Sequence, residues 1–192
     1  MPAVAALSLR CLPLTPERWD DLVDLFQSDR WTRGCFDMWP RQTGKVTNQR
    51  WGAGNREAFE ELVGAGPPPG LLAYEDGRAV GWMAIGPRSD YSRVQRSRLL
   101  APVDDRPTWA VVCFFVRENA RGAGVAAALL KAGVGWARER DAKLVEGYAV
   151  RPEVGSTDPA SLWWGTVELF EKAGFKEIKR ASARRSIMRL ML

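Results

Sequence analysis

The sequence contains no histidine, and this limits the chemistry that the protein can perform. Nucleophilic triads that use histidine and metal sites that depend on imidazole ligands are excluded. Cysteine is scarce as well: Cys11, Cys35 and Cys113 lie far apart, without the paired spacings of zinc ribbons or disulfide frameworks. Proton transfer must therefore use Glu, Asp, Tyr, Cys or water. We expect no metal and a reducing, cytoplasmic location.

Long hydrophobic runs are also missing. No stretch approaches the roughly 20 apolar residues that a membrane helix needs. The N-terminal stretch MPAVAALSLRCL has no basic region before its apolar part, and Arg10 interrupts it. We therefore expect a soluble protein that is not exported. A length of 192 residues, 46% of them hydrophobic, fits a single domain over residues 1–192.

The charge is moderately basic, with a formal net charge of +5 at pH 7. Such a balance suits anionic partners such as a phosphorylated cofactor, nucleic acid or an acidic membrane, but it does not choose among them. The C-terminal basic residues alternate with apolar ones, as in a charged edge hairpin; they are Lys176, Lys179, Arg180, Arg184 and Arg185. We therefore predict neither a nucleic-acid nor a membrane partner, and leave open a homodimer.

Hydrophobic periodicity and turn residues predict the element order β-α-α-β-β-β-α-β-α-β-β, which indicates an α/β (α+β) protein with a mixed sheet and helices on its faces. The predicted strands lie at 7–12, 71–74, 79–85, 109–116, 143–149, 175–178 and 186–190. Helices are predicted to begin near residues 15, 55, 125 and 158. Asn55 is the expected N-cap of the second helix.

Two stretches are predicted as loops. Residues 28–54 have no clean period but contain Trp31, Asp37 and Trp39, and long ordered loops often serve binding. We expect the tryptophans to wall an acceptor pocket and Asp37 to anchor an amine. The loop at 86–108 carries Arg88, Arg93, Arg96 and Arg98, which we expect mainly in solvent, with an anion site as the alternative.

The strand predicted at 109–116 leads, after a short connection, into Arg121-Gly122-Ala123-Gly124-Val125-Ala126 at the start of a helix. Glycines let the backbone approach a ligand closely. The first amides of a helix have no partner within the helix and lie at the positive end of its dipole. The segment is therefore a candidate site for a pyrophosphate.

This segment resembles the acyl-CoA signature of the GNAT superfamily of N-acetyltransferases, Arg/Gln-x-x-Gly-x-Gly/Ala, at Arg121, Gly124 and Ala126. Val116, five residues before the arginine, and the turn at 170–175 also match the family. The resemblance implies a mostly antiparallel sheet with a splayed central strand pair. It also implies transfer of an acetyl or other acyl group from acetyl-CoA to a primary amine of a small molecule or protein. The implied cofactor-binding residues are Phe114, Phe115, Val116, Arg121, Gly122, Ala123, Gly124, Val125 and Ala126.

Two positions depart from the family pattern. Phe170 stands where members often carry a tyrosine that protonates the leaving thiolate, and Trp163 stands where an asparagine is common. We therefore expect Glu146 as base and Tyr148 as acid, because residues two apart on a strand point to the same face. Cys113 is a weaker candidate, since without a cationic neighbour its thiol should stay protonated.

Two other functions are compatible with these residues. The missing tyrosine permits a catalytically silent acyl-CoA sensor. The glycines also match a dinucleotide fingerprint, G-x-G-x-x-A at Gly122, Gly124 and Ala127, with Glu146 downstream for a ribose. That fingerprint normally follows its strand directly, whereas residues 117–121 intervene here, so a dinucleotide-binding oxidoreductase is less favoured.

Overall fold

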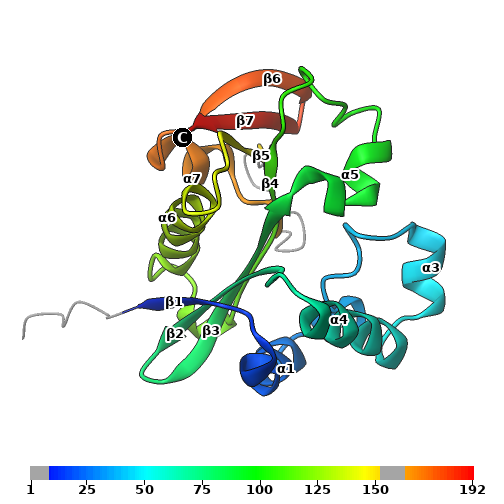
Figure 1. Cartoon of the computed structure of the whole chain (residues 1–192). Helices are drawn as coiled ribbons and strands as arrows, with labels where there is room; N and C mark the ends of the chain where they lie inside the picture. The colour runs from blue at the N-terminus through cyan, green and yellow to red at the C-terminus, as the bar shows by residue number, and fades with distance from the viewer. Residues whose placement is uncertain (1–8, 152–162) are drawn as a thin grey trace, which may run out of the picture.

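The computed structural model describes residues 9–151 and 163–192. Within them, one seven-stranded sheet has the order β1-β2-β3-β4-β5-β7-β6 (Figure 1). The strands are β1 (Arg10–Pro13), β2 (Gly70–Glu75), β3 (Arg78–Pro87), β4 (Trp109–Val116), β5 (Leu144–Val150), β6 (Lys176–Ser182) and β7 (Arg185–Met191). Only β4 and β5 pair in parallel, and the other neighbours are antiparallel. The predicted mixed, mostly antiparallel sheet is confirmed.

Helices cover both faces of the sheet (Figure 1). One face carries α1 (Trp19–Gln27), α2 (Arg30–Cys35), α3 (Gly44–Gln49), α4 (Ala53–Ala65) and α5 (Ser92–Arg96). The other carries α6 (Val125–Arg138) and α7 (Val167–Lys172). Short 3-10 turns are η1 (Pro16–Arg18), η2 (Arg88–Asp90) and η3 (Glu118–Ala120). The start predicted for the last helix, at residue 158, lies outside the described residues. Among the described residues, no helix is long and apolar enough to cross a membrane.

The prediction of an irregular loop at 28–54 is wrong, because α2 and α3 form within it. The Asp29 side chain caps α2 by accepting hydrogen bonds from its first amides. Asn55, expected as an N-cap, instead lies buried inside α4. Its amide donates to the carbonyls of Gly34 (2.9 Å) and Thr47 (3.0 Å). These hydrogen bonds hold the short helices against α4, and no local sequence pattern predicts them.

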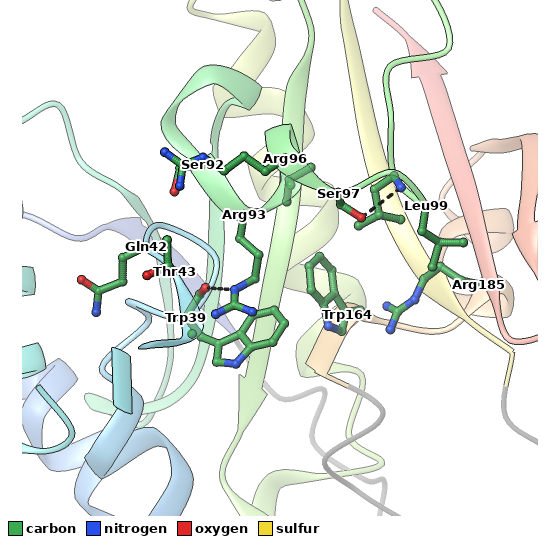
Figure 2. A pocket seen from close by; sticks show the side chains of 13 residues that line it. Trp39, Gln42, Thr43, Ser92, Arg93, Arg96, Ser97, Leu99, Trp164 and Arg185 are labelled. Carbon is green, nitrogen blue, oxygen red and sulfur yellow. Dashed lines mark hydrogen bonds between the residues drawn. The ribbon is translucent and has the colours of Figure 1, made fainter. Parts of the chain in front are cut away.

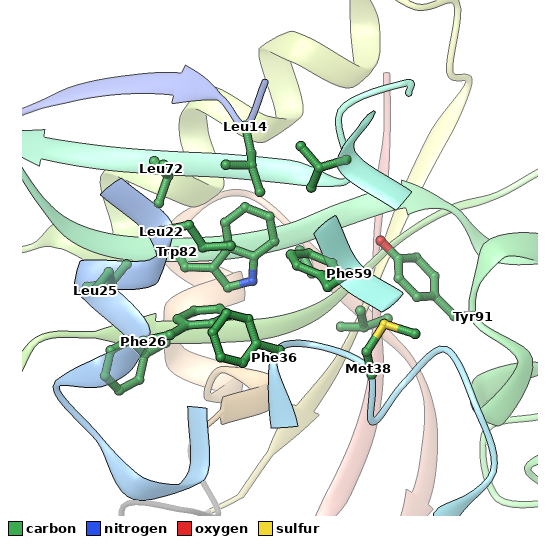
Figure 3. Packing of buried hydrophobic residues seen from close by; sticks show 14 of the residues in the cluster. Leu14, Leu22, Leu25, Phe26, Phe36, Met38, Phe59, Leu72, Trp82 and Tyr91 are labelled. Atoms are coloured by element: carbon green, nitrogen blue, oxygen red, sulfur yellow. The ribbon is translucent and has the colours of Figure 1, made fainter. Parts of the chain in front are cut away.

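Trp82 of β3 lies at the centre of the core on the α1–α5 face (Figure 3). The rings of Phe26 and Phe59 meet it edge-on, with centroids at 6.2 and 5.9 Å. Burying a large apolar side chain contributes about 1.5–3 kcal/mol. This cluster therefore fixes α1 and α4 against the sheet.

The central strands β4 and β5 diverge partway along their length. Their parallel pairing ends at Val111 and Gly147. Val112 then forms a bulge against β3, since Val111 pairs with Ile85 and the next paired residue, Cys113, with Ala84. Beyond this point β4 follows β3 and β5 follows β7. The predicted splayed pair is confirmed, and a bulge that bends one strand supplies its physical cause.

All three tyrosines of the chain have raised pKa values, which predicts alkaline instability. Burial is the main cause at Tyr74, Tyr91 and Tyr148. A tyrosine in the unfolded chain has a pKa of about 10. The pKa values in the folded protein lie higher, so the buried phenols contribute fully to the free energy of unfolding below about pH 10. As the pH rises above this value, the free energy of unfolding falls by roughly 1.4 kcal/mol per pH unit for each fully buried phenol.

The measurement is absorbance of tyrosinate during a titration, with circular dichroism followed in parallel. We expect tyrosinate to form together with the loss of ellipticity, in one cooperative step. The partly buried Tyr74 donates a hydrogen bond to Asp21 through its hydroxyl (2.6 Å), so Tyr74→Phe serves as the control that removes the contribution of this residue. Gradual ionisation around pH 10 with unchanged ellipticity would contradict the assigned burial.

Candidate active site

A cleft of about 590 Å³ opens where β4 leaves β5. Its volume lies within the range of about 300–1,000 Å³ that is typical of small-molecule and cofactor sites. Its walls include every predicted cofactor-binding residue except Ala123: Phe114, Phe115, Val116, Arg121, Gly122, Gly124, Val125 and Ala126. The opposite wall comes from the start of α7, with Trp163, Gly165, Thr166 and Leu169. Sequence and structure thus place these residues around one space.

The glycine turn before α6 gives the cleft its backbone wall. Gly122 and Gly124 have positive φ values of 79° and 81°, and a Cβ on either would meet no atom within 4 Å. The Ala128 amide donates to the carbonyl of Gly124 (3.0 Å). The amides just ahead of it are the first of the helix, which have no partner within the helix. A free backbone surface at the positive end of a helix is suited to an anion.

The arginine of the motif does not extend into the cleft as a free cation. Its Nε donates to the carbonyl of Val116 (3.1 Å), so the Arg121 side chain folds back onto the end of β4. The bond joins the two ends of the turn. Anion binding here would therefore depend on the backbone amides more than on this guanidinium.

Phe170 of α7 presents only an aromatic ring to the strand split. It is fully buried and packs between Phe114 (6.2 Å between centroids) and Phe175 (5.1 Å). A Cβ on Gly147 would lie 2.2 Å from its ring, so the glycine makes room for it. No hydroxyl reaches the cleft from this position.

Tyr148 is the first β5 residue beyond the pairing with β4. Its side chain is fully buried, and its hydroxyl has no hydrogen-bond partner among the described residues. Burial raises the pKa of Tyr148, the Arg88 guanidinium opposes this, and Glu146 raises it further. The phenol is therefore a protonated group at the split, able to donate a hydrogen bond or a proton.

Glu146, expected beside Tyr148 as a base, faces two arginines. It pairs with Ala110 in the closed part of the strand pair, before the split. Its carboxylate accepts from Arg189 Nε (2.9 Å) and Nη2 (2.5 Å), and Arg88 Nη1 lies 3.5 Å away. It borders a separate cleft of about 440 Å³ that includes none of the predicted cofactor residues. The geometry gives Glu146 the position of a structural ion-pair partner.

Asp37 also differs from expectation. Its carboxylate is fully buried and pairs with Arg41 (3.4 Å), while Trp82 Nε1 donates to it (3.3 Å). Burial raises the pKa of Asp37, and the interactions with Arg41, Trp82 and Cys113 oppose this. An amine could not reach this carboxylate without displacing Arg41. The expected role as an anchor for the acceptor is therefore not supported by its position.

Cys113 stays a thiol, as the sequence predicted. Burial raises its pKa well above the usual range, and the neighbouring Asp37 carboxylate adds to the effect. Thiolate chemistry needs the opposite environment.

The two predicted acceptor tryptophans lie in different places. Trp31 packs edge-on against Trp51 (5.4 Å) and Trp163 (6.1 Å), beside the cofactor cleft. Trp39 lines a third space, a groove of about 490 Å³ that it shares with Trp164 (Figure 2). The structure therefore brings only Trp39 to this groove.

Sequence reasoning missed the buried arginines of this region. Arg88, expected in solvent, is buried and donates to the carbonyl of Leu100 (2.6 Å). Arg189 is buried between Glu146 and Asp104. The one available signal was the position of Arg189 inside the apolar strand SIMRLML. No group of three or more candidate metal ligands occurs within residues 9–151 and 163–192.

A family model described as "Acetyltransferase (GNAT) family" matches residues 22–175. The chain belongs to this family of acetyltransferases. Among curated proteins, none matches this sequence significantly.

Solved structures similar to this fold share little sequence with it. A GNAT-family acetyltransferase from Listeria monocytogenes aligns with a TM-score of 0.57 and 13% identity, over 98% of this chain and 97% of that one. The PaiA N-acetyltransferase of Thermoplasma acidophilum, solved with coenzyme A, gives 0.52 and 11%, over 97% and 100%. A polyamine N-acetyltransferase of Drosophila melanogaster gives 0.53 and 13%, over 96% and 100%. At these identities the likeness concerns the fold.

Proposed function

We propose that the protein transfers an acetyl group from acetyl-CoA to a primary amine. The observation that carries the proposal is the cleft at the divergence of β4 and β5, with the glycine turn and the start of α6 on one wall. The CoA pyrophosphate would bind the amides of the turn. The pantetheine would lie along Phe114, Phe115 and Val116, whose edge toward β5 has no strand partner. Cofactor amides would satisfy that edge.

In the proposed reaction, the free amine attacks the carbonyl carbon of the thioester. A C–N bond forms, the C–S bond breaks, and CoA leaves as the thiolate. The nitrogen loses a proton and the thiolate gains one, so the products are an amide and CoA thiol. Tyr148, protonated and beside the split, is the proposed donor to the sulfur. Water takes the proton of the ammonium in this scheme, since Glu146 is bound by two arginines.

The first test is ligand-dependent thermal stability. Acetyl-CoA at about 100 times its Kd should raise Tm by roughly 5–10 °C, since a ligand of the folded state stabilises it by mass action. NAD at the same concentration serves as the control and should have no effect. Stabilisation by NAD but not by acetyl-CoA would overturn the proposal in favour of dinucleotide binding.

The second part of this test separates an enzyme from a silent acyl-CoA sensor. A panel of primary amines is incubated with protein and acetyl-CoA, and acetylated products are detected by mass spectrometry. Enzyme-dependent formation of any N-acetylated product excludes the sensor. Binding of acetyl-CoA without product from any acceptor of the panel, including those named below, would favour it.

A further inference from the structure

The groove that contains Trp39 is bordered by two parts of the chain that are distant in sequence (Figure 2). Residues from the α2–α3 connection and α5 form one side, and Trp164 and Arg185 form the other. Trp39 and Trp164 meet edge-on, with centroids 6.1 Å apart. Two tryptophan faces in a concave site favour a flat or apolar group.

Cations line the groove without acidic residues. Its lining residues are Trp39, Gln42, Thr43, Gly44, Ser92, Arg93, Val94, Arg96, Ser97, Leu99, Leu100, Trp164 and Arg185. The Arg93 guanidinium lies over the Trp39 ring at 3.6 Å, and that of Arg185 over Trp164 at 4.9 Å. Neither forms an ion pair with a described carboxylate, and Arg93 Nη2 is a buried atom without a described hydrogen-bond partner. The groove therefore has positive charge that is not neutralised by its own walls.

Two buried arginines that face carboxylates, Arg41 and Arg189, provide an internal comparison. Their pKa values are raised despite burial. Burial lowers the pKa values of Arg93 and Arg185, which have no such partner. A carboxylate from a ligand would supply the anion that these two lack.

The groove adjoins the reaction site. Arg185 Nη1 donates to the carbonyl of Tyr148 (2.9 Å), and the Trp164 ring lies 6.0 Å from the Tyr148 ring. Trp163, the preceding residue, lines the cofactor cleft instead. A ligand in the groove would therefore lie next to the strand split, on the side opposite the glycine turn.

We propose that this groove selects an acceptor that carries a carboxylate and an apolar side chain beside its amine, such as an aromatic amino acid. The inference rests on the proposed acetyl transfer. Arg93 and Arg185 bind the carboxylate, the tryptophans contact the side chain, and the amine points to the thioester. The free amine becomes the N-acetyl amide, and CoA leaves as the thiol. A polycationic amine is disfavoured because it would meet guanidinium groups.

The test compares matched acceptors that differ in the carboxylate alone. L-tryptophan and tryptamine form one pair, and L-phenylalanine and phenethylamine the other. We expect each amino acid to have a kcat/KM at least about tenfold above its amine, the effect of one charge-assisted hydrogen bond. Arg93→Gln and Arg185→Gln should lower the value for the amino acids about 10- to 100-fold more than the value for the amines. The control is Arg98→Gln, because Arg98 is an exposed residue just after α5 that does not line the groove.

A binding measurement keeps this inference separate from the reaction. N-acetyl-L-tryptophan should bind the wild type more tightly than N-acetyltryptamine, as measured by calorimetry, and the Arg93 variant should lose the difference. This result supports the groove as a binding site for a carboxylate even if acetyl-CoA neither binds nor reacts. In that case only the proposed function fails. Acetylation of the amines with equal or greater efficiency than the amino acids, or equal binding of the two products, overturns the inference while leaving the transferase intact.

Discussion

Replacing Gly124 by glutamate should abolish measurable binding of acetyl-CoA and leave the protein folded. The residue has a φ of 81°, so any side chain there costs about 1–2 kcal/mol in backbone strain. No atom lies within 4 Å of the added Cβ, so the fold has room for it. The carboxylate would lie where the helix amides should hold phosphates, and the two negative charges would repel each other. Isothermal titration calorimetry with acetyl-CoA measures the result.

The chain offers a closely matched control for this variant. Gly77, at the turn between β2 and β3, has a φ of 80° and also has no atom within 4 Å of an added Cβ. Gly77→Glu therefore introduces the same strain and the same charge away from the cleft, and acetyl-CoA should bind as in the wild type. Arg121→Ala should have a smaller effect, because the Arg121 side chain is bonded to Val116. Undiminished affinity in Gly124→Glu would remove the central assignment of this turn.

The features that the sequence predicted correctly are local ones. The glycine turn, the amphipathic α6 and the run of β-forming residues in β4 each depend on neighbours in the chain. The strand split came only from the family resemblance, and its physical cause, the bulge at Val112, appears in the register with β3. The register between strands depends on residues that are distant in sequence, so local patterns in a single sequence do not predict it.

The features that the sequence did not predict have a different physical origin. Glu146 and Asp37 are carboxylates whose roles depend on the cations that face them. Arg189 lies 43 residues from Glu146, and no periodicity links the two. We predicted that Arg88 lies in solvent, because arginine side chains are mostly exposed. In the structure it is buried against Leu100 and Glu146. Buried charges are paired in folded proteins, but the sequence does not say with which partner.

Replacing Tyr148 by phenylalanine should lower kcat by roughly 100-fold without a matching loss of stability or of acetyl-CoA affinity. The hydroxyl has no described hydrogen-bond partner, so its removal breaks no bond that holds the fold. The ring would remain packed against Trp164. A fall in kcat would then report the missing proton donor rather than a damaged structure.

Tyr91→Phe is the matched control for this change. Tyr91 is likewise fully buried on the same face, its hydroxyl also has no described hydrogen-bond partner, and burial raises its pKa. It follows η2 at the start of α5, where it packs against Arg41 (4.7 Å), and does not lie on the diverging strands. We expect the rate of the wild type in this variant. Equal losses in both variants would indicate a packing effect and contradict a chemical role for Tyr148.

The pH dependence of kcat is an independent test of the role of Tyr148 as proton donor. Because the pKa of Tyr148 is raised, its phenol stays protonated while the acceptor ammonium loses its proton, so kcat should rise with pH until the amine is free. Tyr148→Phe should lower the whole profile without moving that rise. In Glu146→Gln, kcat should still rise with pH, but the free energy of unfolding should fall by about 3 kcal/mol, the cost of removing one partner of a buried ion pair. If Glu146→Gln instead removes the rise while Tyr148→Phe reacts at the rate of the wild type, Glu146 is the base and Tyr148 has no part in proton transfer.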